Sequence, residues 1–238
     1  ALTATAARIA TNTGIRTITG TAMTTDASVL LTLAQWLSPA YPVGAFSYSH
    51  GLEWAVQTGD VSDAASFQGW LADVLEHGAG RNDAILLAAA YGDPSTETLR
   101  DLDELAAAMA PSPERRLETV QQGAAFCRTT SAIWPAELNG LAYPVAVGAA
   151  AKLTGLPLAE TLLFYLHGFA GNLTSAAIRL VPLGQTEGQA ALAALAPLCE
   201  RLAAAAQTQT LEDLGGATFL ADIASMKHET QYARLFRS

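Results

Sequence analysis

Two neighbouring stretches decide the fold: LAETLLFYLHGFAGNLTSAAIRL (Leu158–Leu180) and QTEGQAALAALAPLCERLAAAA (Gln185–Ala206). Both are dense in Leu and Ala, which have high helix propensity. Pro157 stands where a helix begins, and Pro182 with Gly184 ends the first stretch before the second starts. Several turns are apolar on more than one face, which is typical of helices buried in a core or at an oligomer interface. These stretches predict two long helices inside a helical protein.

The rest of the sequence extends this pattern in both directions. Apolar residues recur at helical spacing, and the alternation and tight-turn dipeptides of β-hairpins are nearly absent. Gly78 and Gly80 are expected to break the chain between two helices, and Pro197 to kink the helix that contains it. We predict an all-α fold, a single globular bundle of roughly eight to ten helices. The further helices are expected at 29–37, 52–57, 63–77 with Ser62 as N-cap, 83–91, 97–109, 113–130, 145–153 and 219–226.

Composition excludes several classes of protein. Half of the 238 residues are apolar, and 13 basic against 22 acidic residues leave a formal charge of −9. Low charge with high apolar content excludes an intrinsically disordered chain and favours a self-association surface. Scattered Lys and Arg on an acidic chain predict no nucleic-acid partner, and no apolar run is long enough to span a membrane. Cys127 and Cys199 are expected to be small buried residues of a cytoplasmic protein.

Residues 1–26 differ from the remainder of the chain. This segment is rich in Thr and Ala, carries Arg8 and Arg16, and has no acidic residue before Asp26. It lacks the compact apolar core of a secretory signal. We expect an irregular leader, or a remnant foreign to a natural chain that begins near Met23, followed by one helical domain at 27–238.

Sequence signatures of common enzymes are missing. The chain has no G-x-x-x-x-G-K-[ST] phosphate-binding loop and no G-x-S-x-G nucleophile elbow. His228-Glu229 begins like a zinc-protease motif, but Tyr232 stands where the second histidine would be. The four histidines show no close pairing, so the sequence predicts no metal site and no bound cofactor.

A loop rich in Pro, Gly and Ser, SPAYPVGAFSYSHG (Ser38–Gly51), leaves one enzymatic alternative open. Ser47 or Ser49 as nucleophile, with His50 as base and Glu53 as its orienting partner, would make a small serine hydrolase. Neighbouring Ser and His rarely point at each other, however, because catalytic triads are spatial arrangements. In the competing interpretations a serine caps the following helix, or the loop recognises another protein.

One arginine lies on an otherwise apolar helix. Asn172, Ser175 and Arg179 share one helical face because they are three and four residues apart. A structural interpretation places Arg179 buried in a hydrogen-bond network that joins the helix to the loop before it. A functional one makes it an anchor for an acidic or phosphate group of a partner. The sequence supports both.

The C-terminal tail, MKHETQYARLFRS (Met226–Ser238), is basic on an acidic protein. Three large apolar residues alternate with two arginines over positions 232–237. Aromatic and arginine side chains are the usual anchors of protein interfaces, so we expect this tail to dock rather than to fray.

Three segments together resemble one family, the urease accessory protein F family. They are PVGAFSYSHGLE (Pro42–Glu53), NLTSAAIRLVPLGQTEGQ (Asn172–Gln189) and the C-terminal tail, and their order and spacing match over 30–238. Tyr41 and Thr174 stand where Leu and Val are usual, and neither difference changes a charge.

The resemblance implies a non-enzymatic, all-α, homodimeric chaperone for urease. Such a protein bridges accessory protein D/H and the nickel-carrying GTPase G, and so assists GTP-dependent insertion of nickel into apo-urease. It binds no cofactor directly, because the complex handles the nickel. A plain structural subunit without metal traffic is the remaining alternative. Partner contacts are expected at Tyr48, His50, Glu53, Arg179, Gln185, His228, Glu229, Gln231, Tyr232, Arg234, Leu235, Phe236 and Arg237.

Overall fold

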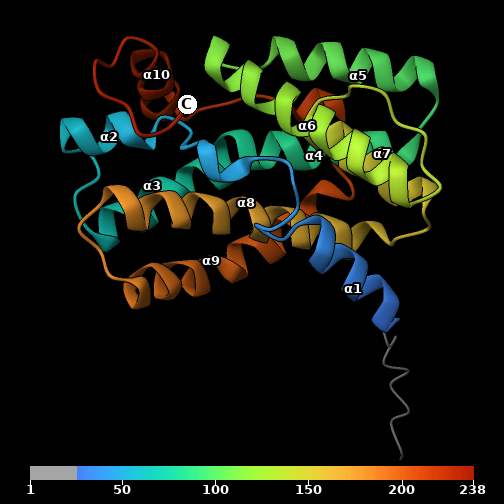
Figure 1. The fold of residues 1–238 in the computed structure, drawn as a ribbon, viewed down its shortest axis with the longest axis horizontal. Coiled ribbons are helices and arrows are strands. Elements are labelled where there is room, and N and C mark those ends of the chain that lie inside the picture. The colour runs from blue at the N-terminus through green and yellow to red at the C-terminus, as the bar shows by residue number, and fades with distance from the viewer. Residues whose placement is uncertain (1–25) are drawn as a thin grey trace, which may run out of the picture.

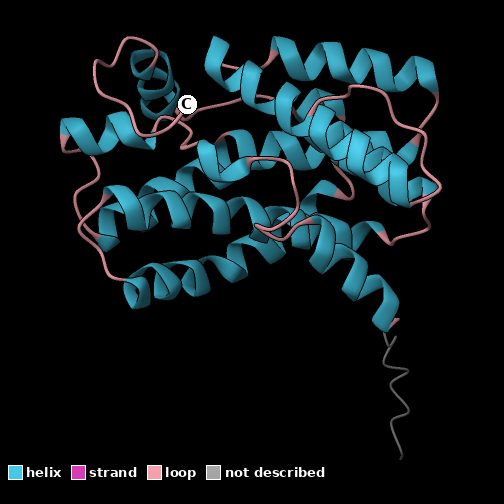
Figure 2. Cartoon of the chain, viewed as in Figure 1, coloured by secondary structure: helices cyan, strands magenta, loops and turns pink. Residues whose placement is uncertain are grey.

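The computed structural model describes residues 26–238, and this part of the chain consists of helices and loops without a strand (Figure 2). The all-α prediction is therefore confirmed, while the expected leader lies outside the described residues except for Asp26. The helices of residues 26–238 are α1 (Ala27–Trp36), α2 (Leu52–Thr58), α3 (Ala64–His77), α4 (Ala79–Gly92), α5 (Thr96–Ala108), α6 (Pro113–Ile133), α7 (Tyr143–Leu153), α8 (Leu158–Leu180), α9 (Gln185–Ala206) and α10 (Phe219–His228), with short 3₁₀ turns η1 (Ala45–Ser47) and η2 (Leu211–Asp213).

The two stretches that decide the fold form α8 and α9 with the expected bounds. They lie side by side along one side of the molecule (Figure 1). Helix α4 runs through the middle and packs most extensively on α7, while α5 and α6 cover the opposite side (Figure 1). Helix α10 contacts α2 and α6, which places the C-terminal tail at one end of the bundle.

Several predicted boundaries were wrong: besides those described next, α1 begins at Ala27 rather than 29, α6 ends at Ile133 rather than 130, and α7 begins at Tyr143 rather than 145. Asp63 rather than Ser62 caps α3: its carboxylate accepts from the Ser66 amide at 2.8 Å, and the Ser66 hydroxyl accepts from the Asp63 amide at 3.0 Å. This reciprocal pair is a capping box. Gly80 does not break the chain but lies inside α4, where an added Cβ would come within 2.8 Å of the Leu75 Cα. Gly80 is thus a site of close contact with α3. Helix α10 ends at His228 rather than at residue 226.

The core is apolar and includes both cysteines. Trp36 and Phe126 are fully buried and meet edge to face, with 5.4 Å between ring centroids. Cys127 and Cys199 are buried free thiols, as predicted. No helix among residues 26–238 is long and apolar enough to cross a membrane. Helix α9 runs through Pro197 without ending.

Candidate functional site

The C-terminal tail folds back on the body and meets two of the segments that the sequence singled out. After α10 ends, the tail returns past α2 and the loop before it (Figure 1). The Ser49 amide donates to the Ser238 carbonyl oxygen at 2.8 Å, and the Arg237 amide donates to the Ser47 carbonyl oxygen at 2.8 Å. These backbone hydrogen bonds join positions about 190 residues apart along the chain. The tail is therefore an ordered part of the described fold.

Glu53 on α2 is the main acceptor for the tail. Its carboxylate accepts from the Leu235 amide at 2.7 Å and from the Phe236 amide at 2.9 Å. The His228 Nε2 atom lies 3.2 Å from the same carboxylate. Glu53 is 8% exposed, and hydrogen bonds to an ionised group are stronger than neutral ones. A single buried carboxylate thus holds the tail and the last residue of α10 together.

His228 is fully buried between two carboxylates. Its Nδ1 atom lies 2.6 Å from Glu114, opposite the contact with Glu53. Because carboxylates only accept, both contacts are hydrogen bonds when both ring nitrogens carry protons. Glu114 also accepts from Arg234 at 2.6 Å. The charges in this part of the tail are therefore compensated by acids from α2 and α6.

A second cluster of buried charged residues lies next to the cluster around His228 and includes two residues of α6. Arg115 and Glu118 form an ion pair, and His50 Nδ1 lies 3.3 Å from Glu118. Burial would raise the pKa of Glu118, but Arg115 and His50 hold it well below its usual range. Burial, and then the Arg115 guanidinium, lowers the pKa of His50. The Ser238 hydroxyl donates to Glu118 at 2.7 Å, which links this group to the tail.

The hydrolase alternative does not fit this geometry. Ser49 is fully buried, and its hydroxyl donates to the Ser238 carbonyl oxygen. The His50 ring faces Glu118, and its Nε2 atom has no hydrogen-bond partner among residues 26–238. Ser47 uses its backbone carbonyl to hold the tail. No serine–histidine hydrogen bond forms in this loop, so a nucleophile and its base are not assembled.

Arg179 is exposed, so the expectation of a buried arginine was wrong. It lies in the last turn of α8, where its guanidinium donates to the Phe46 carbonyl oxygen at 3.0 Å. The guanidinium also lies 4.3 Å from the ring centroid of Phe236. Arg179 thus joins the end of α8 to the Ser38–Gly51 loop and to the tail, and not to the loop before α8 as the structural interpretation had it.

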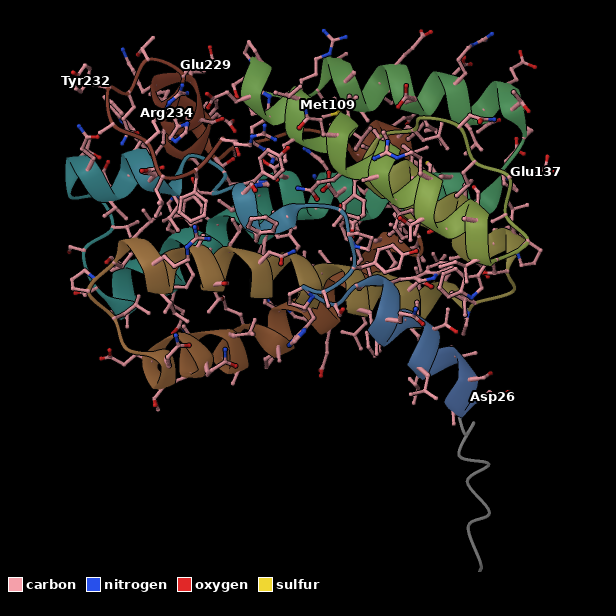
Figure 3. The ribbon with its side chains drawn as sticks, in the orientation of Figure 1. Asp26, Met109, Glu137, Glu229, Tyr232 and Arg234 are labelled. Atoms are coloured by element: carbon pink, nitrogen blue, oxygen red, sulfur yellow. The ribbon has the colours of Figure 1, made fainter. Side chains whose placement is uncertain are left out.

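The predicted partner-binding residues divide into two groups. Phe236 is 4% exposed and packs within this chain, beneath Arg179, rather than projecting outward. By contrast, Tyr232 is fully exposed at the outer edge of the molecule (Figure 3), and Leu235 is 59% exposed. Buried with Phe236 are Tyr48, His50, Glu53, His228 and Gln231; Glu229 is half-buried, and Arg179, Gln185, Arg234 and Arg237 are exposed.

Sequence reasoning missed the acids that hold the tail and one exposed apolar surface. Glu114 and Glu118 are four residues apart on α6, a spacing that could have indicated a shared face. Gln185 makes no hydrogen bond or ion pair with the tail in the described chain, so the structure does not bring it to this site. Helix α10 exposes an apolar stripe at the helical spacing of 219, 220, 223 and 226, namely Phe219, Leu220, Ile223 and Met226.

A cavity of about 220 Å³ lies beneath α10, and its wall includes Asp83, Arg115 and Asp222. Asp83 accepts from the Tyr165 hydroxyl at 2.8 Å. Burial raises the pKa of Asp83 to about 6, although Arg115 and Tyr165 oppose this rise. Among residues 26–238, no three His, Cys, Asp or Glu side chains gather closely enough to hold a metal ion.

The raised pKa of Asp83 predicts a stability that falls with pH. Between about pH 4 and 6 the folded state keeps a proton that the unfolded state loses, so the free energy of unfolding decreases as pH rises through about 6. The pKa rises from 3.8 to about 6, and a pKa difference of one corresponds to about 1.36 kcal/mol, so the free energy of unfolding falls by at most about 3 kcal/mol. Asp83→Asn should remove this loss. Thermal unfolding from pH 4 to 7 should show the variant gaining on the unsubstituted chain up to about pH 6, whereas parallel curves would contradict the prediction.

Comparison with known proteins assigns the chain. The UreF family model matches residues 61–196. The urease accessory protein UreF of Ruegeria pomeroyi is 56% identical over 209 residues, which cover 88% of this chain and 96% of that protein. The UreF of Roseobacter denitrificans is 55% identical over 91% of this chain and 96% of its own length. The UreF of Rhodopseudomonas palustris is 54% identical over 88% of this chain and 93% of its own length. The chain belongs to the UreF family, which consists of urease accessory proteins and not of enzymes.

Proposed function

We propose that this chain is a homodimeric adaptor in the cytoplasm that bridges accessory protein D/H and the nickel-carrying GTPase G. In this role it assists GTP-dependent delivery of nickel to apo-urease, and nickel is cargo of the complex rather than a resident cofactor. Membership in the UreF family supports a role in urease maturation. The partner assignments are our proposal.

The observation that carries the proposal is the exposed apolar surface formed by α10 and the tail. Tyr232 and Leu235 project from a tail whose neighbours are held by buried charged groups. A prearranged apolar surface of this kind is typical of a protein-binding site, because ordering it on binding costs little entropy. We assign this surface to accessory protein D/H.

We assign the surface around Phe46 to GTPase G or to the second copy of the dimer. Phe46 is 69% exposed, and Arg179 and Arg237 lie beside it with no carboxylate partner among residues 26–238. Arg179 is a poor candidate for a catalytic arginine that enters the GTPase, because it already binds Phe46 and Phe236.

The double substitution Tyr232→Ala/Leu235→Ala tests the assignment of D/H. Both side chains are exposed, so we expect normal folding but at least roughly tenfold weaker binding of D/H, since interface aromatic and apolar anchors contribute most of the affinity. Size-exclusion chromatography of the chain mixed with D/H and G measures both associations. Leu31→Ala on α1, also an exposed leucine, is the matched control. Unchanged D/H binding by the double variant would contradict the assignment.

A further inference from the structure

The loop between α6 and α7, residues 134–142, contains an asparagine followed directly by a glycine, Asn139-Gly140. Both residues are exposed, whereas Leu138 before them and Leu141 after them are buried. Glu137, in the same loop, projects outward at the edge of the molecule (Figure 3). The Asn139-Gly140 pair is therefore open to solvent between two buried leucines.

An asparagine side chain can react with the backbone amide that follows it, which is one reason why asparagine is a thermolabile residue. The backbone nitrogen forms a bond to Cγ and gives up its proton. The bond between Cγ and the side-chain nitrogen breaks, and ammonia leaves. Water then opens the resulting cyclic imide at either carbonyl carbon. The products are aspartate and isoaspartate, and no oxidant, metal or enzyme is consumed.

Gly140 leaves the attacking nitrogen unhindered. It has φ +56°, and a Cβ built on it would meet no atom within 4 Å. Because glycine changes its backbone conformation at little steric cost, the pair can rotate into the geometry of attack. Within residues 26–238 the Gly140 N–H donates only to the Cys127 sulfur, which is a weak acceptor, and the Asn139 side chain forms no hydrogen bond or ion pair.

The other two asparagines of residues 26–238 are protected by their helices. Asn82 lies in α4 and Asn172 in α8, so the residues that follow them, Asp83 and Leu173, are helical as well. The amide of a residue inside a helix donates to the carbonyl four residues earlier, and it is released only when the helix opens locally. The Asn82 side chain is also occupied, because its oxygen accepts from the Gly215 amide at 3.2 Å.

We propose that Asn139 is a site of spontaneous deamidation, and that its isoaspartyl product strains the connection between α6 and α7. The main chain of isoaspartate runs through Cγ, so it is longer by one carbon atom than that of asparagine. This inference is independent of the partners named in the proposed function.

The loop has little room for the extra carbon atom, because both of its flanks are fixed. The Leu138 amide donates to the Ser131 hydroxyl at 3.1 Å, and the Ala142 amide donates to the Asp103 carboxylate at 2.6 Å. Leu141, between these two contacts, is 8% exposed. A longer main chain between fixed ends must displace Leu141 or break one of the two hydrogen bonds.

Incubation of the full chain at mildly alkaline pH, followed by peptide mapping with mass spectrometry, tests the site. Asn139 should convert at least roughly tenfold faster than Asn82 and Asn172, because their helices must open first. The conversion should release ammonia and create a substrate for protein isoaspartyl methyltransferase. Asn139→Gln is the matched variant: its longer side chain would have to close a larger ring, so it should give neither signal.

A free peptide of residues 134–142 provides the reference rate. If the peptide deamidates while Asn139 in the folded chain stays intact, the fold protects this asparagine and the proposal is overturned. Equal rates at the three asparagines would also overturn it, because the exposed loop would then confer no reactivity of its own.

Asn139→Asp separates the new charge from the longer main chain. This variant gains the carboxylate at an exposed position without the extra carbon atom, so urea should unfold it at the same concentration as the unsubstituted chain. The aged chain, in which isoaspartate has formed, should unfold at a lower concentration. If the aged chain and the Asn139→Asp variant unfold alike, the proposed strain between α6 and α7 is overturned.

Discussion

Replacing Glu53 with Gln is expected to release the C-terminal tail from the body of the protein. The Glu53 carboxylate accepts from the Leu235 and Phe236 amides and lies 3.2 Å from His228. A glutamine offers one carbonyl oxygen, and its NH₂ group cannot accept. At least one buried donor therefore loses its acceptor, and His228 loses one of its two carboxylates.

Loss of one partner from a buried charged contact costs about 3–5 kcal/mol. Most of this cost should appear as local opening of the tail, because the core helices do not depend on Glu53. Amide hydrogen exchange of residues 229–238, followed by mass spectrometry, should speed up by roughly a hundredfold or more. Binding of D/H should weaken together with it, since the partner would have to order the tail.

Glu97→Gln on α5 is the matched control, because it makes the same chemical change at an exposed carboxylate. Its exchange in the tail should equal that of the unsubstituted chain. If Glu53→Gln leaves tail exchange unchanged, the Glu53 carboxylate does not hold the tail. If the tail opens but D/H binding persists, the tail holds no part of that interface.

Gly51→Ala is expected to push α10 away from α2. Gly51 has φ +78°, and an added Cβ would lie 2.5 Å from the Ser225 amide nitrogen and 2.8 Å from its Cα. These are backbone atoms of a helix, so no side-chain rotation relieves the contact. The displacement would also break the 2.6 Å hydrogen bond between the Ser112 and Ser225 hydroxyls. We expect a loss of about 3 kcal/mol or more in unfolding free energy.

Gly59→Ala separates the two causes of that loss. Gly59 has φ +84°, but an added Cβ there meets no atom within 4 Å. It should cost only about 1 kcal/mol, which is the strain of a left-handed conformation. Urea unfolding of both variants gives the comparison, and limited proteolysis at the tail should detect opening in Gly51→Ala alone. Equal losses in the two variants would show that backbone conformation, rather than contact with Ser225, sets the cost.

Much of the fold follows from local chemistry. The bounds of α8 and α9 could be predicted because each is specified by residues within one turn of its ends and by apolar spacing along its own length. The same local rules misplaced the cap of α3 by one residue, because Ser62 and Asp63 are both good caps and only the hydrogen bonds with Ser66 distinguish them. Gly80 was misjudged because its role depends on Leu75, on the neighbouring helix.

The candidate site was only partly predictable. The family resemblance carried by three segments is confirmed by the comparisons, and two of these segments meet at the tail. The direction in which each tail residue points could not be predicted. Tyr232 and Phe236 are both aromatic residues among arginines, yet the first is fully exposed and the second is buried beneath Arg179.

The sequence by itself determined the helical class, the two central helices and the family, since these depend on propensity, periodicity and motifs read along the chain. Only the tertiary structure decided which charges pair. His228 meets Glu114 across 114 positions and Glu53 across 175, and Leu235 reaches Glu53 across 182. The physical reason is that the energy of a buried ion pair or hydrogen bond depends on distance in space and on exclusion of water. Neither quantity exists until the helices have packed.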